Sequence, residues 1–580
     1  MRVCCLALLV CTACAPRARP TSRPASQPAS QPTTATSEAF ARAEAATPEA
    51  VRIGDRCAAK RRFARGTCAA GQRCAPFPGG YCTARCERGR EACADKGARC
   101  VGTPGSGELC LRRCKASGDC RGHQGYVCDA QQHVCTLPGF IAPAPRHCAG
   151  AAPGRGKWQT PVALSSAKGP GHYQVAPSAA LGADGRLVVA YIAAPKRGEN
   201  NAIAVSVLGA DGSLAVRERA LSVGRESAYD PWITRETRGR LLLVWLGFDG
   251  RRAPEKNMQV GLARSDDGAS WTAPRAVHDS GDCRDKSGKA SDGCLDKPMI
   301  LAGRRPRARS ARGGGGDVIY LLYFSAKHDA LRLRRSLDGA KTFSAATSAA
   351  ASAAYGNATV DARGVLHLAY VAAPDAKQTP DLLGDKASAA YLVRSSDMGK
   401  TFSKPERVSP AGTPVPFYFS NTQVRHDARR KITYVIYPRG DRHAPWRLML
   451  ATRRGGAGSW TTRALGDSRC AHHMLPQAAL DKRGALHVTW LENRDGKGLV
   501  AYRRCPSGGA NCAAVERVSE APFASYELVR HSPRWLGDYG ALVVDEKRQL
   551  LHATWTQTVN DTSGGGGVRA RVFAARRALR

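Results

Sequence analysis

The sequence lacks several features that would have pointed to a membrane-spanning or nucleic-acid-binding protein. After its first residues it contains no apolar run of the roughly 20 residues that a transmembrane helix requires. It also contains no nucleic-acid-binding motif, although its formal net charge is +39. Arginine is spread over all segments, which indicates a solvated basic surface with weak attraction to polyanions. We therefore expect no nucleic-acid partner, and contact with a membrane only through a lipid anchor.

The N-terminal residues 1–14 are typical of an export signal. A charged start is followed by a short apolar stretch and by small residues before Cys14. Thr12-Ala13-Cys14 resembles a bacterial lipobox, with Cys11 where that family usually has Leu; the resemblance implies cleavage before Cys14 and lipidation of its sulfur. Plain secretion is the alternative. We expect a lipid-anchored protein of the bacterial cell envelope, with the outer membrane favoured, facing the periplasm or the cell surface.

Residues 15–50 almost lack large apolar side chains. Alanine, proline, serine, threonine and glutamine dominate this segment, so nothing in it offsets the entropy cost of ordering. We predict a disordered linker that tethers the following domains to the anchor.

A cysteine-rich segment follows, and we assign residues 54–148 to a disulfide-rich module. An even number of cysteines in an exported segment poor in Leu, Ile and Val indicates disulfides in place of a core. Zinc is the alternative, but no matching histidine pair is present, and the connectivity stays open. The cysteines are at positions 57, 68, 74, 82, 86, 93, 100, 110, 114, 120, 128 and 135. Their local spacing resembles small EGF-like or Dickkopf-like repeats, which implies a rigid spacer or adhesive module.

Later cysteines predict local staples on loops. Cys283–Cys294 and Cys505–Cys512 each bracket a short polar stretch, so we expect a disulfide in each. Cys148 and Cys470 remain and could pair with each other.

Seven segments share a short polar turn followed by an alternating apolar run that ends on an aromatic residue. These runs are residues 184–191, 238–245, 317–323, 363–370, 430–437, 483–490 and 548–555. Such recurrence predicts small antiparallel sheets that stack radially. We therefore predict an all-β fold, with a β-propeller over residues 157–576. Seven blades are expected, with six as the alternative if one repeat is a decoration.

A second motif follows the third strand of several repeats. Ser395-Ser-Asp397-Met-Gly399-Lys-Thr401-Phe402 has the pattern of an Asp-box, in which the carboxylate holds a tight turn and the aromatic fills the gap between strands. Degenerate copies are expected at Asp338 to Phe343, with Ala340 in place of glycine, and at Asp266 to Trp271. With these boxes the chain resembles the sialidase-like, or BNR-repeat, propeller superfamily. That resemblance concerns the fold, because the boxes lie on turns remote from that family's active centre.

The two ends of the repeat region predict how the propeller closes. Residues 157–165 resemble a fourth strand with no blade before it, whereas the last repeat lacks its fourth strand. We expect the N-terminal strand to complete the last blade and so remove two exposed edges.

The residues just before each first strand are expected to surround one end of the channel, which we call the channel mouth. Polar and aromatic residues recur there, and they suit carbohydrate through stacking and hydrogen bonds, or else cap the strand ends. The candidate ligand-binding residues are His172, Tyr173, Tyr229, Asp230, Asp296, Lys297, Tyr355, Asn357, Asn421, His472, His473, Asp538 and Tyr539. We expect no cofactor and no metal, since neighbouring histidines such as His472 and His473 rarely reach one ion.

The resemblance implies a test for catalysis. A sialidase requires three arginines around the substrate carboxylate and a tyrosine nucleophile supported by an acid. The family's Phe/Tyr-Arg-Ile-Pro motif is absent, and the catalytic candidates are Tyr539, Asp538 and Asp230. We favour a monomeric, non-catalytic envelope protein that binds a glycan or another envelope protein. An exo-sialidase-like glycoside hydrolase and a structural scaffold of the envelope are the alternatives.

Overall fold

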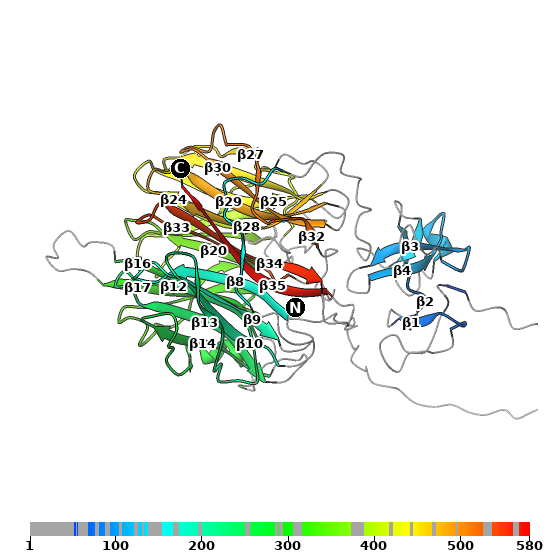
Figure 1. Ribbon diagram of the computed structural model, residues 1–580, viewed down its shortest axis with the longest axis horizontal. Helices are drawn as coiled ribbons and strands as arrows, with labels where there is room; N and C mark the ends of the chain where they lie inside the picture. The colour runs from blue at the N-terminus through cyan, green and yellow to red at the C-terminus, as the bar shows by residue number, and fades with distance from the viewer. Residues whose placement is uncertain are drawn as a thin grey trace, which may run out of the picture. The chain divides into compact units, whose positions relative to one another are not determined.

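Nearly all the regular elements in the described part of the chain are β-strands, and the chain divides into two compact units. Strands β1 to β6 belong to a cysteine-rich part, and the remaining strands belong to a unit that runs from Gly139 to Arg580 (Figure 1). No described helix is long and apolar enough to cross a membrane. The computed structural model describes residues 52–53, 55, 68–75, 81–86, 93–103, 107–120, 126–129, 133–136, 153–165, 173–194, 200–249, 256–284, 288, 294–305, 316–372, 388–416, 422–440, 445–456, 458–466, 471–494, 497–525, 536–560 and 568–579.

The cysteine-rich part is built from two-stranded sheets held by disulfides. Its elements are β1 (Arg73–Ala75), β2 (Tyr81–Thr83), β3 (Ala98–Thr103), β4 (Gly107–Arg112), the 3-10 helix η1 (Ser117–Asp119), β5 (Val127–Asp129) and β6 (Val134–Thr136). The described pairs are Cys68–Cys82, Cys86–Cys100, Cys93–Cys110, Cys114–Cys128 and Cys120–Cys135. The prediction of disulfides is therefore confirmed for these cysteines, and their connectivity, which the sequence left open, is now assigned.

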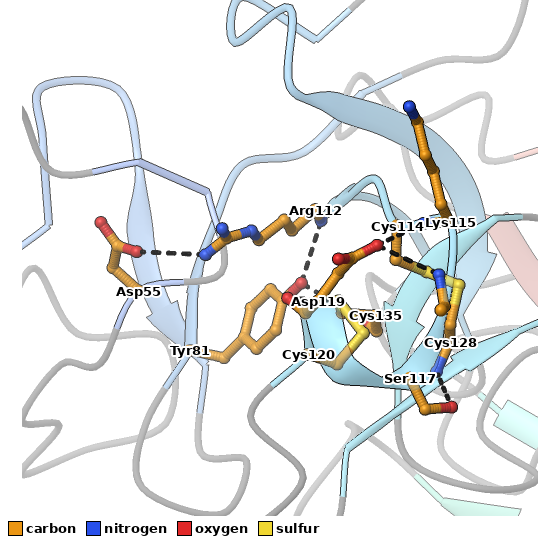
Figure 2. Close-up of a disulfide and its surroundings, with 11 residues drawn as sticks. Asp55, Tyr81, Arg112, Cys114, Lys115, Ser117, Asp119, Cys120, Cys128 and Cys135 are labelled. Atoms are coloured by element: carbon orange, nitrogen blue, oxygen red, sulfur yellow. Dashed lines mark hydrogen bonds and ion pairs between the residues drawn. A yellow bond between two sulfur atoms is a disulfide. The ribbon is translucent and has the colours of Figure 1, made fainter.

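Polar contacts supplement the disulfides of this part. The Tyr81 hydroxyl accepts a hydrogen bond from the Arg112 backbone N–H at 3.0 Å and donates one to the Cys135 carbonyl at 3.3 Å (Figure 2). Asp119 accepts from the backbone of Lys115 at 2.6 Å, and its pKa is lowered mainly by that bond. One buried tyrosine thus links β4 to β6 where few large apolar residues are present.

Seven antiparallel sheets, six of four strands and one of five, form the blades of a propeller, which confirms the larger of the two predicted blade numbers. Blade 1 contains β8 (Tyr173–Leu181), β9 (Leu187–Ala194), β10 (Ala202–Leu208) and β11 (Leu214–Leu221). Blade 2 contains β12 (Ser227–Arg235), β13 (Leu241–Asp249), β14 (Lys256–Ser265) and β15 (Arg275–Ala276), and the 3-10 helix η3 (Ser280–Cys283) follows it. Blade 3 contains β16 (Leu295–Arg304), β17 (Asp317–Ser325), β18 (Ala330–Ser336) and β19 (Thr347–Ala351).

The remaining blades follow the same order. Blade 4 contains β20 (Ala353–Val360), β21 (Leu366–Ala372), β22 (Ala389–Ser395) and β23 (Glu406–Arg407). Blade 5 contains β24 (Gln423–Asp427), β25 (Ile432–Arg439), β26 (Arg447–Arg454) and β27 (Thr461–Ala464). Blade 6 contains β28 (His472–Leu480), β29 (Leu486–Arg494), β30 (Lys497–Cys505) and β31 (Glu516–Arg517), with β32 (Phe523–Ala524) added beside β30. Blade 7 contains β33 (Ala541–Asp545), β34 (Leu550–Asn560), β35 (Val568–Ala578) and β7 (Val162–Ala163).

The propeller is a closed ring. The first strand of each blade contacts the first strand of the next, and β33 contacts β8, so the ring ends where it began. The predicted closure is confirmed: β7 pairs with β35, with Ala163 opposite Phe573 and Val162 opposite Ala574. Figure 1 shows β34 and β35 at the red end of the chain beside β8, which is cyan.

The Asp-box of blade 4 forms as the sequence predicted. The Asp397 carboxylate accepts hydrogen bonds from the backbone of Lys400 at 3.1 Å and Thr401 at 3.0 Å, and from the Thr401 hydroxyl at 2.6 Å. Gly399 has a φ of +77°, and its N–H donates to the Ser395 hydroxyl at 2.8 Å. In blade 3 the same turn forms around Asp338, and Ala340 adopts the positive φ in place of glycine, at +58°. The aromatic residues Phe343 and Phe402 pack against the cores, as expected.

In blade 2 the aspartate of the Asp-box lies one residue later than predicted. The sequence assigned its aspartate as Asp266, but that side chain is 86% exposed and pairs with Arg240. Asp267 makes the box contacts instead, accepting from the backbone of Ala269 at 2.8 Å and Ser270 at 2.7 Å. The leading serine of the motif is present as Ser265. The turn is one residue shorter than the full Asp-box, and for this reason the predicted aspartate was one position too early. Trp271 still packs against the blade.

A disulfide replaces the Asp-box in blade 6. Cys505 occupies the strand position of Ser395, because it pairs with Leu486 as Ser395 pairs with Leu366. Cys512 lies as far beyond Cys505 as Phe402 lies beyond Ser395, and the two cysteines are bonded. Gly509 has a φ of +74°, close to that of Gly399. The second predicted loop disulfide, Cys283–Cys294, is likewise present.

We predict that this disulfide and an Asp-box are interchangeable. Replacing Cys505 and Cys512 by alanine should reduce the free energy of unfolding by about 2.5 kcal/mol, the chain-entropy value for so short a loop. A variant with Cys505→Ser, Ser507→Asp, Asn511→Thr and Cys512→Phe should recover at least half of that loss in urea unfolding. A grafted turn no more stable than the double-alanine variant would contradict the equivalence.

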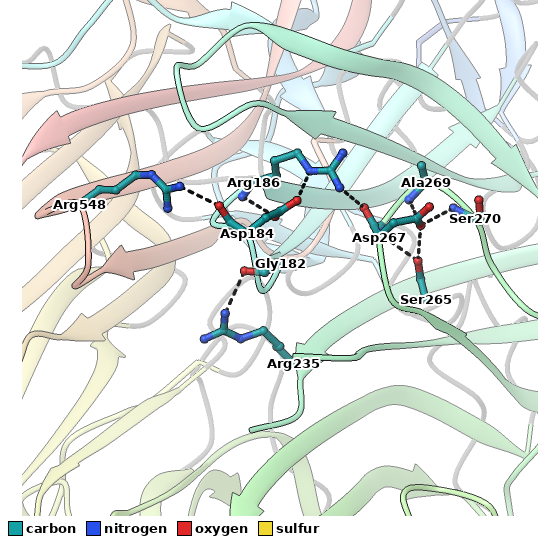
Figure 3. Close-up of polar contacts among 10 residues, drawn as sticks. Gly182, Asp184, Arg186, Arg235, Ser265, Asp267, Ala269, Ser270 and Arg548 are labelled. Carbon is teal, nitrogen blue, oxygen red and sulfur yellow. Dashed lines mark hydrogen bonds and ion pairs between the residues drawn. The ribbon is translucent and has the colours of Figure 1, made fainter. Parts of the chain in front are cut away.

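Arginine side chains join the turns of adjacent blades. Arg186 donates to the Asp267 carbonyl of blade 2 at 3.2 Å, and Arg548 of blade 7 donates to the Asp184 carbonyl of blade 1 at 2.7 Å (Figure 3). Arg235 donates to the Gly182 carbonyl at 2.9 Å. Part of the arginine excess therefore satisfies backbone carbonyls between blades.

Candidate functional site

The first strands of four blades carry the same backbone irregularity, and it positions the candidate site. In each case the ladder is interrupted at a residue with positive φ followed by proline, which cannot donate to the ladder. The residues with positive φ are Ala176 (+55°), Asp230 (+52°), Lys297 (+49°) and Leu475 (+51°). Since alanine and leucine share this conformation, the bulge belongs to the fold. Only in blades 2 and 3 are the residues at the bulge charged, so only there does the bulge position charged side chains.

The charged residues meet at the channel mouth. Lys297 Nζ lies 2.9 Å from both oxygens of Asp230 on the neighbouring blade and 2.5 Å from Asp538 Oδ2 on blade 7. The Tyr539 hydroxyl donates to Asp230 Oδ1 at 3.4 Å, and the Asp296 carboxylate accepts from the Lys297 backbone N–H at 2.9 Å. One ammonium group therefore links blades 2, 3 and 7. We call these five residues the ion cluster.

Burial controls the electrostatics of the ion cluster. The loss of solvent raises the pKa of Asp230 to about 6; Lys297 lowers that pKa, and Asp296 and Asp538 raise it further. The pKa of the Tyr539 hydroxyl is raised well above its usual value by burial and by Asp230 and Asp538. Three carboxylates facing one ammonium give the cluster a net negative charge when all of them are ionised. Tyr539 stays protonated at neutral pH.

The pKa of Asp230 predicts a change in stability with pH. The raised pKa means that the folded protein binds this proton more tightly than the unfolded chain, so the contribution is complete below pH 4 and is lost as the pH rises through 6. Relative to Asp230→Asn, the wild type should lose about 2–3 kcal/mol of unfolding free energy between pH 4 and pH 7. Urea unfolding of both proteins at these two pH values measures the difference. A constant difference between them would show that Asp230 has an ordinary pKa.

Aromatic side chains surround the ion cluster. Trp232 follows the bulge of β12, meets the Tyr539 ring edge-on at 5.6 Å, and packs against the cores on three sides. Tyr229 stacks on Phe248 at 5.2 Å, and Tyr173 packs against the same core as Tyr539. Tyr173, Tyr229 and Trp232 are each only partly buried.

A glycine brings blade 7 close to blade 1 at this point. Gly537 has a φ of +82°, and a Cβ there would lie 2.4 Å from the Ala176 backbone nitrogen. Only glycine therefore permits the approach that places Asp538 and Tyr539 beside the bulge of β8.

Other predicted mouth residues form contacts of their own. Asn357 is buried, and its side-chain oxygen Oδ1 accepts a hydrogen bond from the Arg425 guanidinium at 3.2 Å. His472 accepts a hydrogen bond from the backbone N–H of Trp446 at 3.3 Å, and His473 accepts one from that of Leu448 at 3.4 Å. Burial lowers the pKa of His472 to about 4 and that of His473 to about 3. These three residues thus bind adjacent blades together. His172 and Asn421 lie outside the described residues, as does the side chain of Tyr355.

The weak catalytic candidates Asp230, Asp538 and Tyr539 are brought together by the fold. Their arrangement differs from what the sialidase resemblance implied, because the cation among them is a lysine that two carboxylates already neutralise. Sequence reasoning named these residues separately and missed the lysine bridge. Its signal was the pair of Asp-Pro and Lys-Pro bulges at Asp230 and Lys297.

Comparisons with known proteins give similarity of fold at low sequence identity. No protein-family model matches the chain, and no curated protein matches it. A protein of unknown function from Dyadobacter fermentans is 12% identical, with 73% of this chain and 99% of that one covered and a TM-score of 0.41. The intramolecular trans-sialidase from Ruminococcus gnavus is 11% identical, covering 60% and 94%, with a TM-score of 0.38. The α-L-arabinofuranosidase Arb93A from Fusarium graminearum is 13% identical, covering 60% and 92%, also with a TM-score of 0.38.

Proposed function

We propose that the channel mouth binds a glycan without catalysis. The observation that carries this proposal is the pairing of partly exposed aromatic rings with an ion cluster that is already internally bonded. Rings such as Trp232 and Tyr229 suit the apolar faces of sugars, and the carboxylates of the cluster suit hydroxyl donors. A partly buried lysine held by Asp230 and Asp538 is a poor partner for further chemistry.

The charge of the mouth favours a neutral or amino-bearing sugar. Among the described residues, Asp230, Asp296 and Asp538 lie around the Lys297 ammonium group, so these three carboxylates would repel an incoming carboxylate. Sialosides and uronic acids are therefore disfavoured, whereas an amino group would pair with the carboxylates.

A glycan array probed with the purified chain tests this proposal. We expect binding to neutral or amino-bearing glycans, at least tenfold weaker for Trp232→Ala and unchanged for Lys400→Met, whose side chain is exposed on an Asp-box turn. Binding confined to sialylated glycans, or binding unaffected by Trp232→Ala, would contradict it.

A glycoside hydrolase is the second candidate, and one observation favours it. Asp230, with a pKa of about 6, lies beside Tyr539 and Asp538, so the site contains an acid that could donate a proton near neutral pH. Turnover of fluorogenic glycosides by the wild type, abolished in Asp230→Asn and Tyr539→Phe, would establish this activity. Absence of turnover over a panel of glycosides would favour the binding protein.

We further propose that the chain is exported and lipid-anchored through Cys14, with the cysteine-rich part as a spacer. Residues 1–14 and the polar segment behind them support this proposal. Radiolabelled palmitate should be incorporated into the wild type expressed in a bacterial host and not into Cys14→Ser. Equal labelling of both would contradict the anchor.

A further inference from the structure

A second group of chemistry-bearing side chains lies at the opposite end of the channel. Asp361 follows β20, His367 lies on β21, and His426 lies near the end of β24. Asp361 Oδ2 is 3.2 Å from His367 Nε2 and 3.7 Å from His426 Nε2, and the three ligand atoms lie within 4.8 Å of one another. Neighbouring ligands of a tetrahedral zinc ion, bound at about 2.1 Å, are about 3.4 Å apart. The observed separations are of that size.

Blade 6 provides an internal comparison. Asp481 and His487 form the same pair there at 3.3 Å, and the second nitrogen of His487 bonds the Tyr502 hydroxyl at 2.8 Å. In the next blade, Val544 takes the sequence position of His426, since each directly precedes the aspartate of its turn. His487 therefore bonds both Asp481 and Tyr502, and no third metal-ligating group joins them among the described residues, which indicates a structural role.

Blade 4 departs from that pattern in two ways. Leu392 holds the register position of Tyr502, so His367 Nδ1 is buried and has no hydrogen-bond partner among the described residues. His426 adds a second imidazole, stacked on His367 with ring centroids 4.4 Å apart. Blade 6 therefore has an Asp–His pair, whereas the corresponding place between blades 4 and 5 has three metal-ligating groups.

The surrounding contacts orient Asp361 and His426. Asp361 Oδ1 accepts the backbone N–H groups of Arg363 at 2.8 Å and Val365 at 3.0 Å, which directs Oδ2 toward the histidines. His426 Nδ1 lies 2.9 Å from the Thr433 hydroxyl, which leaves Nε2 facing Asp361. Hydrogen bonds of this kind on the outer side of metal ligands fix their orientation.

We propose that Asp361, His367 and His426 bind one divalent transition-metal ion, with Zn²⁺ as the first choice. Two imidazoles and a carboxylate suit the borderline metals, and the side chain of His426 is 15% exposed, so a fourth position is open to water or an exogenous ligand. The ion joins blades 4 and 5 at the end of the channel away from the ion cluster.

Calorimetric titration of the chelator-treated full chain with Zn²⁺ tests this site. We expect the wild type to bind one equivalent of Zn²⁺. The affinity should be at least 100-fold weaker for His426→Val, a change to the residue type that blade 7 has at the corresponding position, Val544. His328→Asn is the matched control, because His328 forms a His–Asp pair with Asp282 at 3.0 Å and should leave the affinity unchanged. Binding by His426→Val that equals the wild type, or no binding by the wild type, would overturn the proposal.

A measurement on the wild type alone guards against a variant that fails to fold. Saturating Zn²⁺ should slow the carbethoxylation of His426 by diethyl pyrocarbonate at least tenfold, as followed by peptide mass spectrometry, and leave His328 unaffected. Equal modification of His426 with and without Zn²⁺ would also overturn the proposal.

Discussion

Replacing Lys297 with methionine should reduce the free energy of unfolding by about 3–5 kcal/mol at pH 7. Methionine keeps the length of the side chain and removes the ammonium group, so Asp230, Asp296 and Asp538 lose the Lys297 cation that they share. The loss should be smaller at pH 5, because protonation of Asp230 then removes part of the uncompensated charge. Urea unfolding at the two pH values measures both effects.

The control for this prediction is Lys400→Met, which removes an exposed ammonium group and should change stability by less than about 0.5 kcal/mol. If Lys297→Met were as stable as the wild type at pH 7, the lysine would not be what compensates the buried carboxylates. The ion cluster would then need another explanation.

Replacing Trp158 with alanine should cost about 3–5 kcal/mol, the usual loss for a buried tryptophan. Trp158 precedes β7, is buried, and meets the Tyr502 ring of blade 6 edge-on at 5.2 Å. The Arg577 guanidinium of blade 7 lies 5.7 Å from its ring. The side chain therefore fixes the N-terminal strand on two blades at once, and thermal or urea unfolding should show the loss.

Thr160→Ala is the control for the same segment, since Thr160 is exposed and its replacement should leave the stability within about 0.5 kcal/mol of the wild type. A Trp158→Ala protein with wild-type stability would mean that this segment contributes nothing to the closed ring.

The fold could be predicted because its signals are local. The turn at Asp361 to Gly364 and the alternating run that follows it identify a blade whatever the rest of the chain does. The missing fourth strand of the last repeat predicted the pairing of β7 with β35 for the same reason. The box of blade 2 was misassigned because one deleted residue makes Asp266 and Asp267 equally plausible in sequence.

The candidate site was harder to predict because it depends on contacts across the ring. Lys297 bonds Asp538, which lies 241 residues later in the chain, and only the order of the blades brings them together. Sequence patterns selected both residues as part of the mouth and could not show that they neutralise each other. His472 and His473 carried the same polar signal and instead bind blades 5 and 6 together. The group of Asp361, His367 and His426 was missed because its third member comes from the next blade.

Closure of the ring by β7 can be tested with one cross-link. Leu164 donates its N–H to the Val572 carbonyl, so Ala163 and Phe573 form the adjacent non-hydrogen-bonded pair, about 4.5 Å apart at Cα and suited to a disulfide. Peptide mass spectrometry should find a disulfide in the variant with Ala163→Cys and Phe573→Cys. None should form with Ala163→Cys and Ala574→Cys, whose side chains lie on opposite faces of the sheet. Free thiols at positions 163 and 573 in the folded protein would contradict a propeller closed by its N-terminal strand.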